Sequence, residues 1–125
     1  MTTVYDRLGV RTIVNAKGTS TRLSGGRMHP EVAQAMAEAS RHCVDMAELQ
    51  AAASAAIAEA TGAEAGLVTS GAAAALLLGT AACVAGLDPT RMSRLPETAG
   101  MKNEVIVARS QRNFYDHAVR TAGVT

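Results

Sequence analysis

The sequence predicts an α/β fold in which an N-terminal arm and helices precede the first part of a mostly parallel sheet. Short β-rich runs alternate with helical segments in the second half of the chain, an order typical of parallel sheets. Hydrophobic residues occupy 48% of the 125 positions but aromatic residues only 2%, which favours closely packed helices with small side chains. The formal net charge of +1 gives no indication of a surface that binds nucleic acid or an anionic membrane.

The first 44 residues are expected to form an arm and a first helix. Residues 11–15 (RTIVN) are a short β-rich run, which breaks at the Gly/Ser/Thr-rich stretch AKGTSTRLSGGRM. Pro30 suits the first turn of a helix, because its missing N–H needs no acceptor there. Apolar residues then recur at helical spacing, and we expect this helix to end near Arg41 or His42.

A second helix is predicted from about Met46 to Thr61. Asp45 and Glu48 have the spacing of a capping box, with aspartate in place of the usual serine or threonine. Alanine-rich sequence follows, and Gly62 supplies a C-terminal stop signal.

Strands and helices are expected to alternate after this second helix. Residues 65–69 (AGLVT) are predicted to form a short buried strand, and residues 72–86 a helix that ends at its last glycine. Residues 87–103 have the composition of a loop, and residues 104–108 (EVIVA) are predicted to be a second buried strand, with a short helix after it. Because two strands are too few for a complete sheet of this kind, we expect the front part of a larger domain.

Residues 66–87 (GLVTSGAAAALLLGTAACVAGL) form an uncharged run that allows three interpretations. A membrane span is disfavoured, because the run is rich in Ala and Gly and its flanks lack aromatic residues and a Lys/Arg asymmetry. A buried strand and helix without a ligand is the second interpretation. The third is an anion site, because a helix N-terminus presents unpaired N–H groups. Gly71 and Ala72 keep that backbone accessible, and the hydroxyls of Thr69 and Ser70 add donors.

Four stretches, in this order, resemble the selenocysteine-synthase-like group of pyridoxal-phosphate enzymes: TIVNAKGTSTRLSGGRM, VDMAELQ, TGAEAGLVTSGAAAAL and RNFYDHAVRTAG. This group is related to L-seryl-tRNA(Sec) selenium transferase and has the aspartate-aminotransferase (type I) fold. The resemblance runs from about Tyr5 to Gly123. It implies an arm with a first helix over residues 1–44, and the start of the large domain that binds pyridoxal 5'-phosphate over residues 45–125.

The resemblance also implies which residues bind the cofactor. It assigns the cofactor phosphate to the turn made by Thr69, Ser70, Gly71 and Ala72. Tyr115 or His117 is expected to stack on the pyridine ring, because both follow a strand whose carboxyl end is the usual ligand-binding edge. The alternative is that Phe114 and Tyr115 are core residues and that His117 caps the short helix.

The arm is expected to help bind the substrate, in this family often at the active site of a neighbouring subunit. The candidate substrate-binding residues are Asn15, Lys17, Gly18, Thr19, Arg22 and Arg27. The planar guanidinium of Arg22 or Arg27 suits a carboxylate or a phosphate. The alternative is that both arginines are solvated in a loop. The run RLSGGRM differs from the TNLGR-type run of bacterial selenocysteine synthases, so no selenium-specific role is expected.

The resemblance implies the N-terminal part of a lyase or transferase that acts on a small amino acid or an amino-sugar acid by aldimine formation and elimination. No catalytic residue is expected in this chain. Neither Lys17 nor Lys102 stands where the family carries its Schiff-base lysine, which comes further downstream. The 125 residues alone are therefore expected to be inactive.

A cytoplasmic location is expected, since the first residues (MTTVYDRLGV) lack the basic start and apolar run of a signal peptide. The resemblance implies a homo-oligomer. Neither nucleic acid nor membrane is an expected partner. No metal site is expected either, because His29 and His42 lack partners at ligand spacing. The alternative function is a non-catalytic phosphate-binding or interaction module that uses the same helix end.

Overall fold

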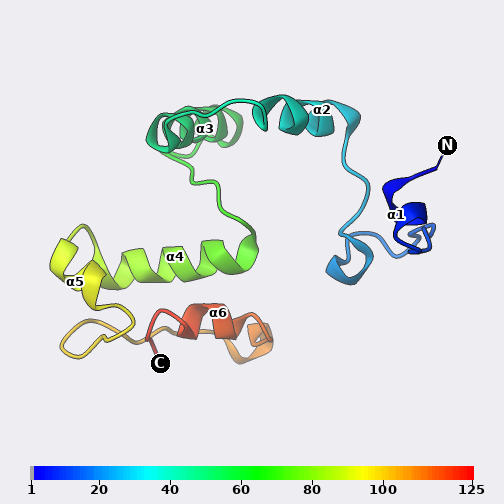
Figure 1. The fold of residues 1–125 in the computed structure, drawn as a ribbon. Coiled ribbons are helices and arrows are strands. Elements are labelled where there is room, and N and C mark those ends of the chain that lie inside the picture. Colours follow the sequence, from blue (N-terminus) through cyan, green and yellow to red (C-terminus); the bar gives the residue numbers. More distant parts are fainter. Residues whose placement is uncertain (1) are drawn as a thin grey trace. The chain divides into compact units, whose positions relative to one another are not determined.

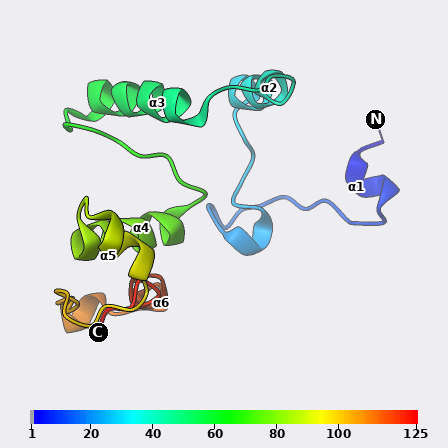
Figure 2. The same cartoon turned by 60° about the vertical axis from the view of Figure 1, so that its left-hand side comes forward.

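The computed structural model describes residues 2–125 and shows a helical chain (Figures 1 and 2). The chain divides into two compact units, Met1–Val44 and Asp45–Thr125. No β-strand occurs within residues 2–125, so the predicted mostly parallel sheet is wrong for this structure.

The first unit consists of short helices joined by extended chain. Helix α1 (Val4–Arg7) begins at a capping box, in which Asp6 N–H donates to Thr3 Oγ1 at 3.1 Å and Thr3 N–H donates back to the Asp6 carboxylate at 2.6 Å. A single 3-10 turn (Thr21–Leu23) follows, and α2 (Pro30–Ala39) begins at the proline as predicted. The β-rich run at residues 11–15 is extended and unpaired rather than part of a sheet.

Helix α3 (Met46–Thr61) has the bounds that the sequence predicted. One carboxylate oxygen of Asp45 accepts hydrogen bonds from the N–H groups of Ala47 and Glu48, which satisfies two of the free donors of the first turn. Gly62 ends the helix at a φ of 74°, a left-handed conformation that glycine adopts without strain.

Helix α4 (Ala72–Ala85) is the centre of the second unit. It packs against α5 (Pro89–Arg94) and α6 (Asp116–Arg120), and Figures 1 and 2 both show α6 running beside it. A 3-10 turn (Arg109–Gln111) precedes α6. The most buried apolar residues come from the end of α4 and from the segment after α6, namely Val84, Ala85, Ala122 and Val124. Among the described residues, none of the helices is both long and apolar enough to cross a membrane.

Helix α5 lies in the segment that was predicted to be a loop. The Asp88 carboxylate accepts hydrogen bonds from Thr90 N–H and Arg91 N–H, and Pro89 occupies the first turn. Aspartate followed by proline is a known helix-start signal, which the loop prediction overlooked because the segment contains two prolines and several polar residues.

The two predicted buried strands are extended segments that mostly lack backbone partners. In residues 104–108, Ile106 is 99% exposed. Val105 N–H donates to the Thr125 carbonyl oxygen at 2.9 Å, and the Ala108 carbonyl accepts from Gln111 N–H within the 3-10 turn that follows. In residues 65–69, side chains of α3 rather than a neighbouring strand supply the partners. The strand predictions failed because β-branched residues favour an extended backbone, whereas a sheet also needs a partner along its length.

Candidate functional site

The turn before α4 leaves the N-terminus of this helix open. Gly71 is the N-cap, with a φ of 149°, and no side chain caps the first turn. A Cβ atom at Gly71 would meet no atom within 4 Å in the described part of the chain. The first intrahelical bond is from Ala75 N–H to the Gly71 carbonyl at 3.0 Å, so the N–H groups at the start of α4 have no intrahelical acceptor.

The hydroxyls of the turn differ in their partners. Thr69 Oγ1 donates to the Gly71 carbonyl oxygen at 2.9 Å and accepts from Gly71 N–H at 3.4 Å, so this hydroxyl closes the turn on itself. Ser70 is exposed, and its hydroxyl forms no hydrogen bond with the described residues. Thr69 therefore shapes the turn, and Ser70 has a hydroxyl free to bind an anion.

Two other helices of this unit, α3 and α5, differ from α4 because each has an aspartate as its N-cap. The carboxylates of Asp45 and Asp88 occupy the N–H groups that begin α3 and α5. At the start of α4 a glycine stands in the same position, and α4 is 14 residues long. Its partial positive charge is therefore available to an external anion rather than neutralised by a carboxylate of the chain.

The segment that leads into this turn is held by α3. Gln50 Nε2 donates to the Val68 carbonyl at 2.8 Å, and Gln50 Oε1 accepts from Val68 N–H at 3.2 Å. One turn later on α3, Ser54 Oγ accepts from Gly66 N–H at 3.0 Å. Sequence analysis missed both residues, because nothing in a single sequence links a helix side chain to a backbone group 12 or 18 residues away.

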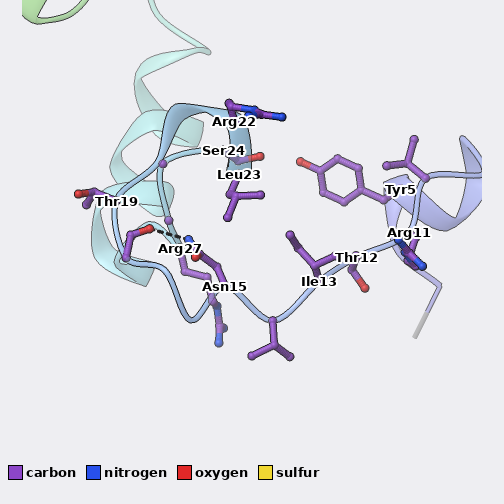
Figure 3. A pocket seen from close by; sticks show the side chains of 15 residues that line it. Tyr5, Arg11, Thr12, Ile13, Asn15, Thr19, Arg22, Leu23, Ser24 and Arg27 are labelled. Atoms are coloured by element: carbon purple, nitrogen blue, oxygen red, sulfur yellow. Dashed lines mark hydrogen bonds between the residues drawn. The ribbon is translucent and has the colours of Figure 1, made fainter. Parts of the chain in front are cut away.

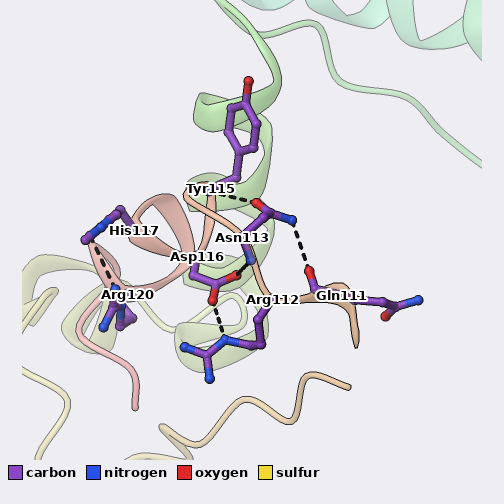
Figure 4. A network of polar contacts seen from close by, with 7 residues as sticks. All are labelled: Gln111, Arg112, Asn113, Tyr115, Asp116, His117 and Arg120. Atoms are coloured by element: carbon purple, nitrogen blue, oxygen red, sulfur yellow. Dashed lines mark hydrogen bonds and ion pairs between the residues drawn. The ribbon is translucent and has the colours of Figure 1, made fainter. Parts of the chain in front are cut away.

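The segment before α6 is organised by Asn113 and Asp116 (Figure 4). Asn113 Oδ1 accepts from Tyr115 N–H at 2.8 Å, and Asn113 N–H donates to Asp116 Oδ1 at 3.4 Å. Arg112 Nε donates to the other oxygen of Asp116 in an ion pair. This hydrogen bond from the Arg112 guanidinium, with a smaller one from Asn113, holds the pKa of the Asp116 carboxyl below its ordinary value, although partial desolvation opposes the shift.

The two predicted stacking residues, Tyr115 and His117, are both exposed, and so is the neighbouring Phe114. Phe114 is 90% exposed and Tyr115 is 62% exposed, which contradicts the alternative that this aromatic pair is part of a core. Arg120 Nη2 lies 3.3 Å from His117 Nδ1 (Figure 4). Because a guanidinium can only donate, His117 Nδ1 is the acceptor, and the hydrogen of the neutral ring is assigned to Nε2. His117 belongs to α6, the helix that packs against α4, and Tyr115 is the N-cap of α6.

The arm encloses a hollow of about 930 Å³ within the first unit (Figure 3). All the predicted substrate-binding residues except Lys17 line it, namely Asn15, Gly18, Thr19, Arg22 and Arg27. Arg11 and Tyr5, which sequence analysis did not single out, also contribute, and Figure 3 shows the Tyr5 ring pointing into the hollow. No carboxylate is among its lining residues, so its formal charge is positive.

Asn15 gives the arm its local shape. Its Nδ2 donates to the Gly18 carbonyl at 2.8 Å, and its Oδ1 accepts from Lys17 N–H at 3.0 Å. Both polar groups of the Asn15 amide are therefore used within the chain, which makes Asn15 a shaping residue of the hollow. The arginines of the hollow form no ion pair with any described residue and remain free for an external anion.

An open helix N-terminus and an arginine-lined hollow are both suited to anionic groups, and the proteins that this chain resembles are enzymes. It is 40% identical over 114 residues to 5'-C-glycyluridine monooxygenase-decarboxylase of Streptomyces sp. This alignment covers 91% of this chain and 29% of that enzyme. The chain is 33% identical over 119 residues to D-glucosaminate-6-phosphate ammonia lyase of Salmonella typhimurium. This alignment covers 95% of this chain and 32% of the lyase.

A solved structure of D-glucosaminate-6-phosphate ammonia-lyase superimposes on 98% of this chain with a TM-score of 0.93 and 31% identity, and covers 34% of that chain. The chain matches no established family model. It spans about a third of the length of the relatives it matches. The similarity to a lyase agrees with the predicted lyase class, whereas the specific likeness to selenocysteine synthases stays a prediction.

Proposed function

We propose that this chain forms part of a pyridoxal-phosphate-dependent lyase that acts on an amino-sugar acid. The observation that carries the proposal is the similarity to D-glucosaminate-6-phosphate ammonia lyase, which extends over 95% of the chain in sequence and 98% in structure. We propose pyridoxal 5'-phosphate as the cofactor because the Thr-Ser-Gly-Ala turn and the arm resemble those of pyridoxal-phosphate enzymes. The Schiff-base lysine is expected outside these 125 residues.

The N-terminus of α4 fits a cofactor phosphate. A phosphate there would accept hydrogen bonds from free N–H groups of the first turn and from the Ser70 hydroxyl. The absence of a side chain at Gly71 leaves the approach open, because a Cβ at this position would point into empty space that the phosphate would otherwise use. We therefore propose Ser70, Gly71 and Ala72 as the phosphate site, with Thr69 holding the turn.

The arm fits the anionic end of the substrate. Arg22 and Arg27 line a hollow that has no carboxylate, so a phosphate or carboxylate of the substrate would gain charge-assisted hydrogen bonds there. The name of the lyase relative specifies a substrate with both an acid group and a phosphate. We propose that these arginines bind one of the two groups, and selection for phosphorylated substrates follows if that group is the phosphate.

Tyr115 or His117 is proposed to contact the flat ring of the cofactor. The Arg120 contact holds His117 with Nδ1 as an acceptor, so the neutral imidazole presents its face and Nε2–H to its surroundings. When bound, pyridoxal phosphate supplies an electron sink for the bond that breaks at the substrate α-carbon. The residues of this chain would contribute binding and orientation: Ser70, Gly71 and Ala72 would hold the phosphate, Tyr115 or His117 would contact the ring, and Arg22 or Arg27 would bind the substrate.

The test is a measurement of ammonia release by the purified native protein. D-glucosaminate 6-phosphate should yield ammonia only when pyridoxal phosphate is supplied, and the unphosphorylated D-glucosaminate should be a poorer substrate. If no ammonia forms although the protein binds the cofactor, the lyase proposal is wrong.

A second candidate activity follows from the higher identity, 40%, to the monooxygenase-decarboxylase. The substrate in that enzyme's name, 5'-C-glycyluridine, contains an amino acid but no phosphate. The same protein should therefore be incubated with 5'-C-glycyluridine in air while carbon dioxide is measured. Carbon dioxide release in the absence of any ammonia from the sugar acid would favour this second activity.

A further inference from the structure

Gln50 takes the position that a neighbouring strand would take in a sheet. Its side-chain amide makes two hydrogen bonds to the same residue, as donor to the Val68 carbonyl at 2.8 Å and as acceptor from Val68 N–H at 3.2 Å. The described residues offer Val68 no backbone partner. This one side chain therefore satisfies both polar groups of Val68.

Two further side chains of α3 reinforce the contact. Ser54 lies four residues after Gln50, on the same face of the helix, and accepts from Gly66 N–H at 3.0 Å. Ile57 packs so closely against Gly66 that a Cβ there would lie 2.5 Å from Ile57 Cγ2. The extended segment is thus held along α3 at Gly66 and at Val68, and only then enters the turn.

We infer that Gln50 is a positioning residue that sets the conformation of the turn from Thr69 to Gly71. The inference rests on the proposed function, because the turn is the proposed phosphate site. Val68 immediately precedes Thr69, whose hydroxyl hydrogen bonds to Gly71 and to no other residue that the structure describes. The direction in which the chain leaves Val68 therefore determines where the Ser70 hydroxyl and the first N–H groups of α4 lie.

Two variants separate this role from simple packing. Gln50→Leu keeps a similar volume but removes both hydrogen bonds. Gln50→Glu keeps the acceptor for Val68 N–H, but above the ordinary carboxyl pKa of about 4.3 it sets a second acceptor against the Val68 carbonyl. Below that pH the protonated carboxyl again donates and accepts, like the amide. Gln34→Leu on α2 is the matched control, since the Gln34 side chain is exposed and makes no hydrogen bond to a described residue.

The native protein should be measured in two ways. Hydrogen–deuterium exchange of peptides that cover residues 66–72 reports the turn itself, and Gln50→Leu should raise the rate at Val68 roughly tenfold. Titration with pyridoxamine 5'-phosphate, which has no aldehyde to react with lysines, reports the phosphate site. Gln50→Leu and Gln50→Glu should bind it roughly tenfold more weakly at pH 7. The loss of affinity of Gln50→Glu, compared with the parent at the same pH, should become smaller toward pH 4. Gln34→Leu should bind pyridoxamine 5'-phosphate as tightly as the parent at every pH.

The outcomes distinguish this inference from the proposed function. If the parent binds pyridoxamine 5'-phosphate and every Gln50 variant binds it equally well, Gln50 does not position the turn and the inference is wrong, whatever the exchange rates. If exchange in the turn responds to Gln50→Leu but the parent binds no pyridoxamine 5'-phosphate, the phosphate site is wrong while the positioning of the turn stands. A deficit of Gln50→Glu that does not change with pH would also overturn the inference, since packing alone would explain it.

Discussion

Thr98 Oγ1 donates a hydrogen bond of 2.7 Å to the carbonyl oxygen of Gly123, and Thr98 is only 5% exposed. The same hydroxyl accepts a bond of 3.0 Å from Asn103 Nδ2. Gly123 is required at this contact, because its φ is 89° and a Cβ would lie 1.9 Å from the Pro96 carbonyl oxygen. One buried hydroxyl thus joins the segment after α5 to the segment after α6, on which the second unit depends for its small core.

Thr98→Val should destabilise the native protein by about 1–3 kcal/mol, because valine has the same shape but leaves the Gly123 carbonyl and the Asn103 amide without a partner. The measurement is the urea midpoint of unfolding, compared with Thr90→Val on α5. The Thr90 hydroxyl makes no hydrogen bond within residues 2–125, so its replacement should have little effect. Equal midpoints for the two variants would show that the Thr98 contact contributes nothing.

The ion pair of Asp116 with Arg112 predicts a pH dependence of stability. Because the pKa of Asp116 is lowered in the folded protein, its contribution is fully present above the unfolded pKa of about 3.9 and is lost as the pH falls through the folded value. Asp116→Asn should therefore lower the melting temperature at pH 7, and the difference from the parent should narrow below about pH 4. A difference that stays constant from pH 7 to pH 2.5 would contradict this assignment.

The sequence predicted those elements whose signals lie within a few residues. Helix α3 was predicted correctly because Asp45 and Gly62 mark its ends, and α4 because Gly71 and Gly86 frame an alanine-rich run. The strands could not be judged in the same way. Residues 104–108 carry the right side chains, but whether they form a strand depends on partners distant in the sequence.

The candidate site was predictable to the same extent. The turn from Thr69 to Ala72 has a local signature of small and hydroxyl residues before a helix, and the structure places it at an open N-terminus. The contacts that hold it could not be predicted, because Gln50 reads as an ordinary polar residue of an amphipathic helix. The lining residues of the hollow were only partly predicted, because Tyr5 and Arg11 lie outside the glycine-rich stretch from which the substrate-binding candidates were chosen.

The arginines of the arm provide a test of substrate selection. Arg27→Gln and Arg22→Gln should each raise the KM for D-glucosaminate 6-phosphate by on the order of ten- to a hundredfold, as expected for the loss of a charged hydrogen bond. Affinity for pyridoxamine 5'-phosphate should not change. Arg41→Gln, just beyond α2 and not among the lining residues, is the control. If the KM for the unphosphorylated acid rises equally, the arginines bind the carboxylate rather than the phosphate.

The most direct test of the central claim is the affinity of Gly71→Val for pyridoxamine 5'-phosphate, measured by calorimetry on the native protein. Valine at a φ of 149° strains the turn and fills the space before the N–H groups of α4. The loss of two or three charge-assisted hydrogen bonds, each worth about 1.5–3 kcal/mol, should weaken binding roughly a hundredfold or more, and Ser70→Ala roughly tenfold. Gly79→Val, in the middle of α4 where a Cβ also meets no described atom within 4 Å, is the matched control and should bind like the parent. If Gly71→Val binds as tightly as the parent, the phosphate does not lie at the N-terminus of α4.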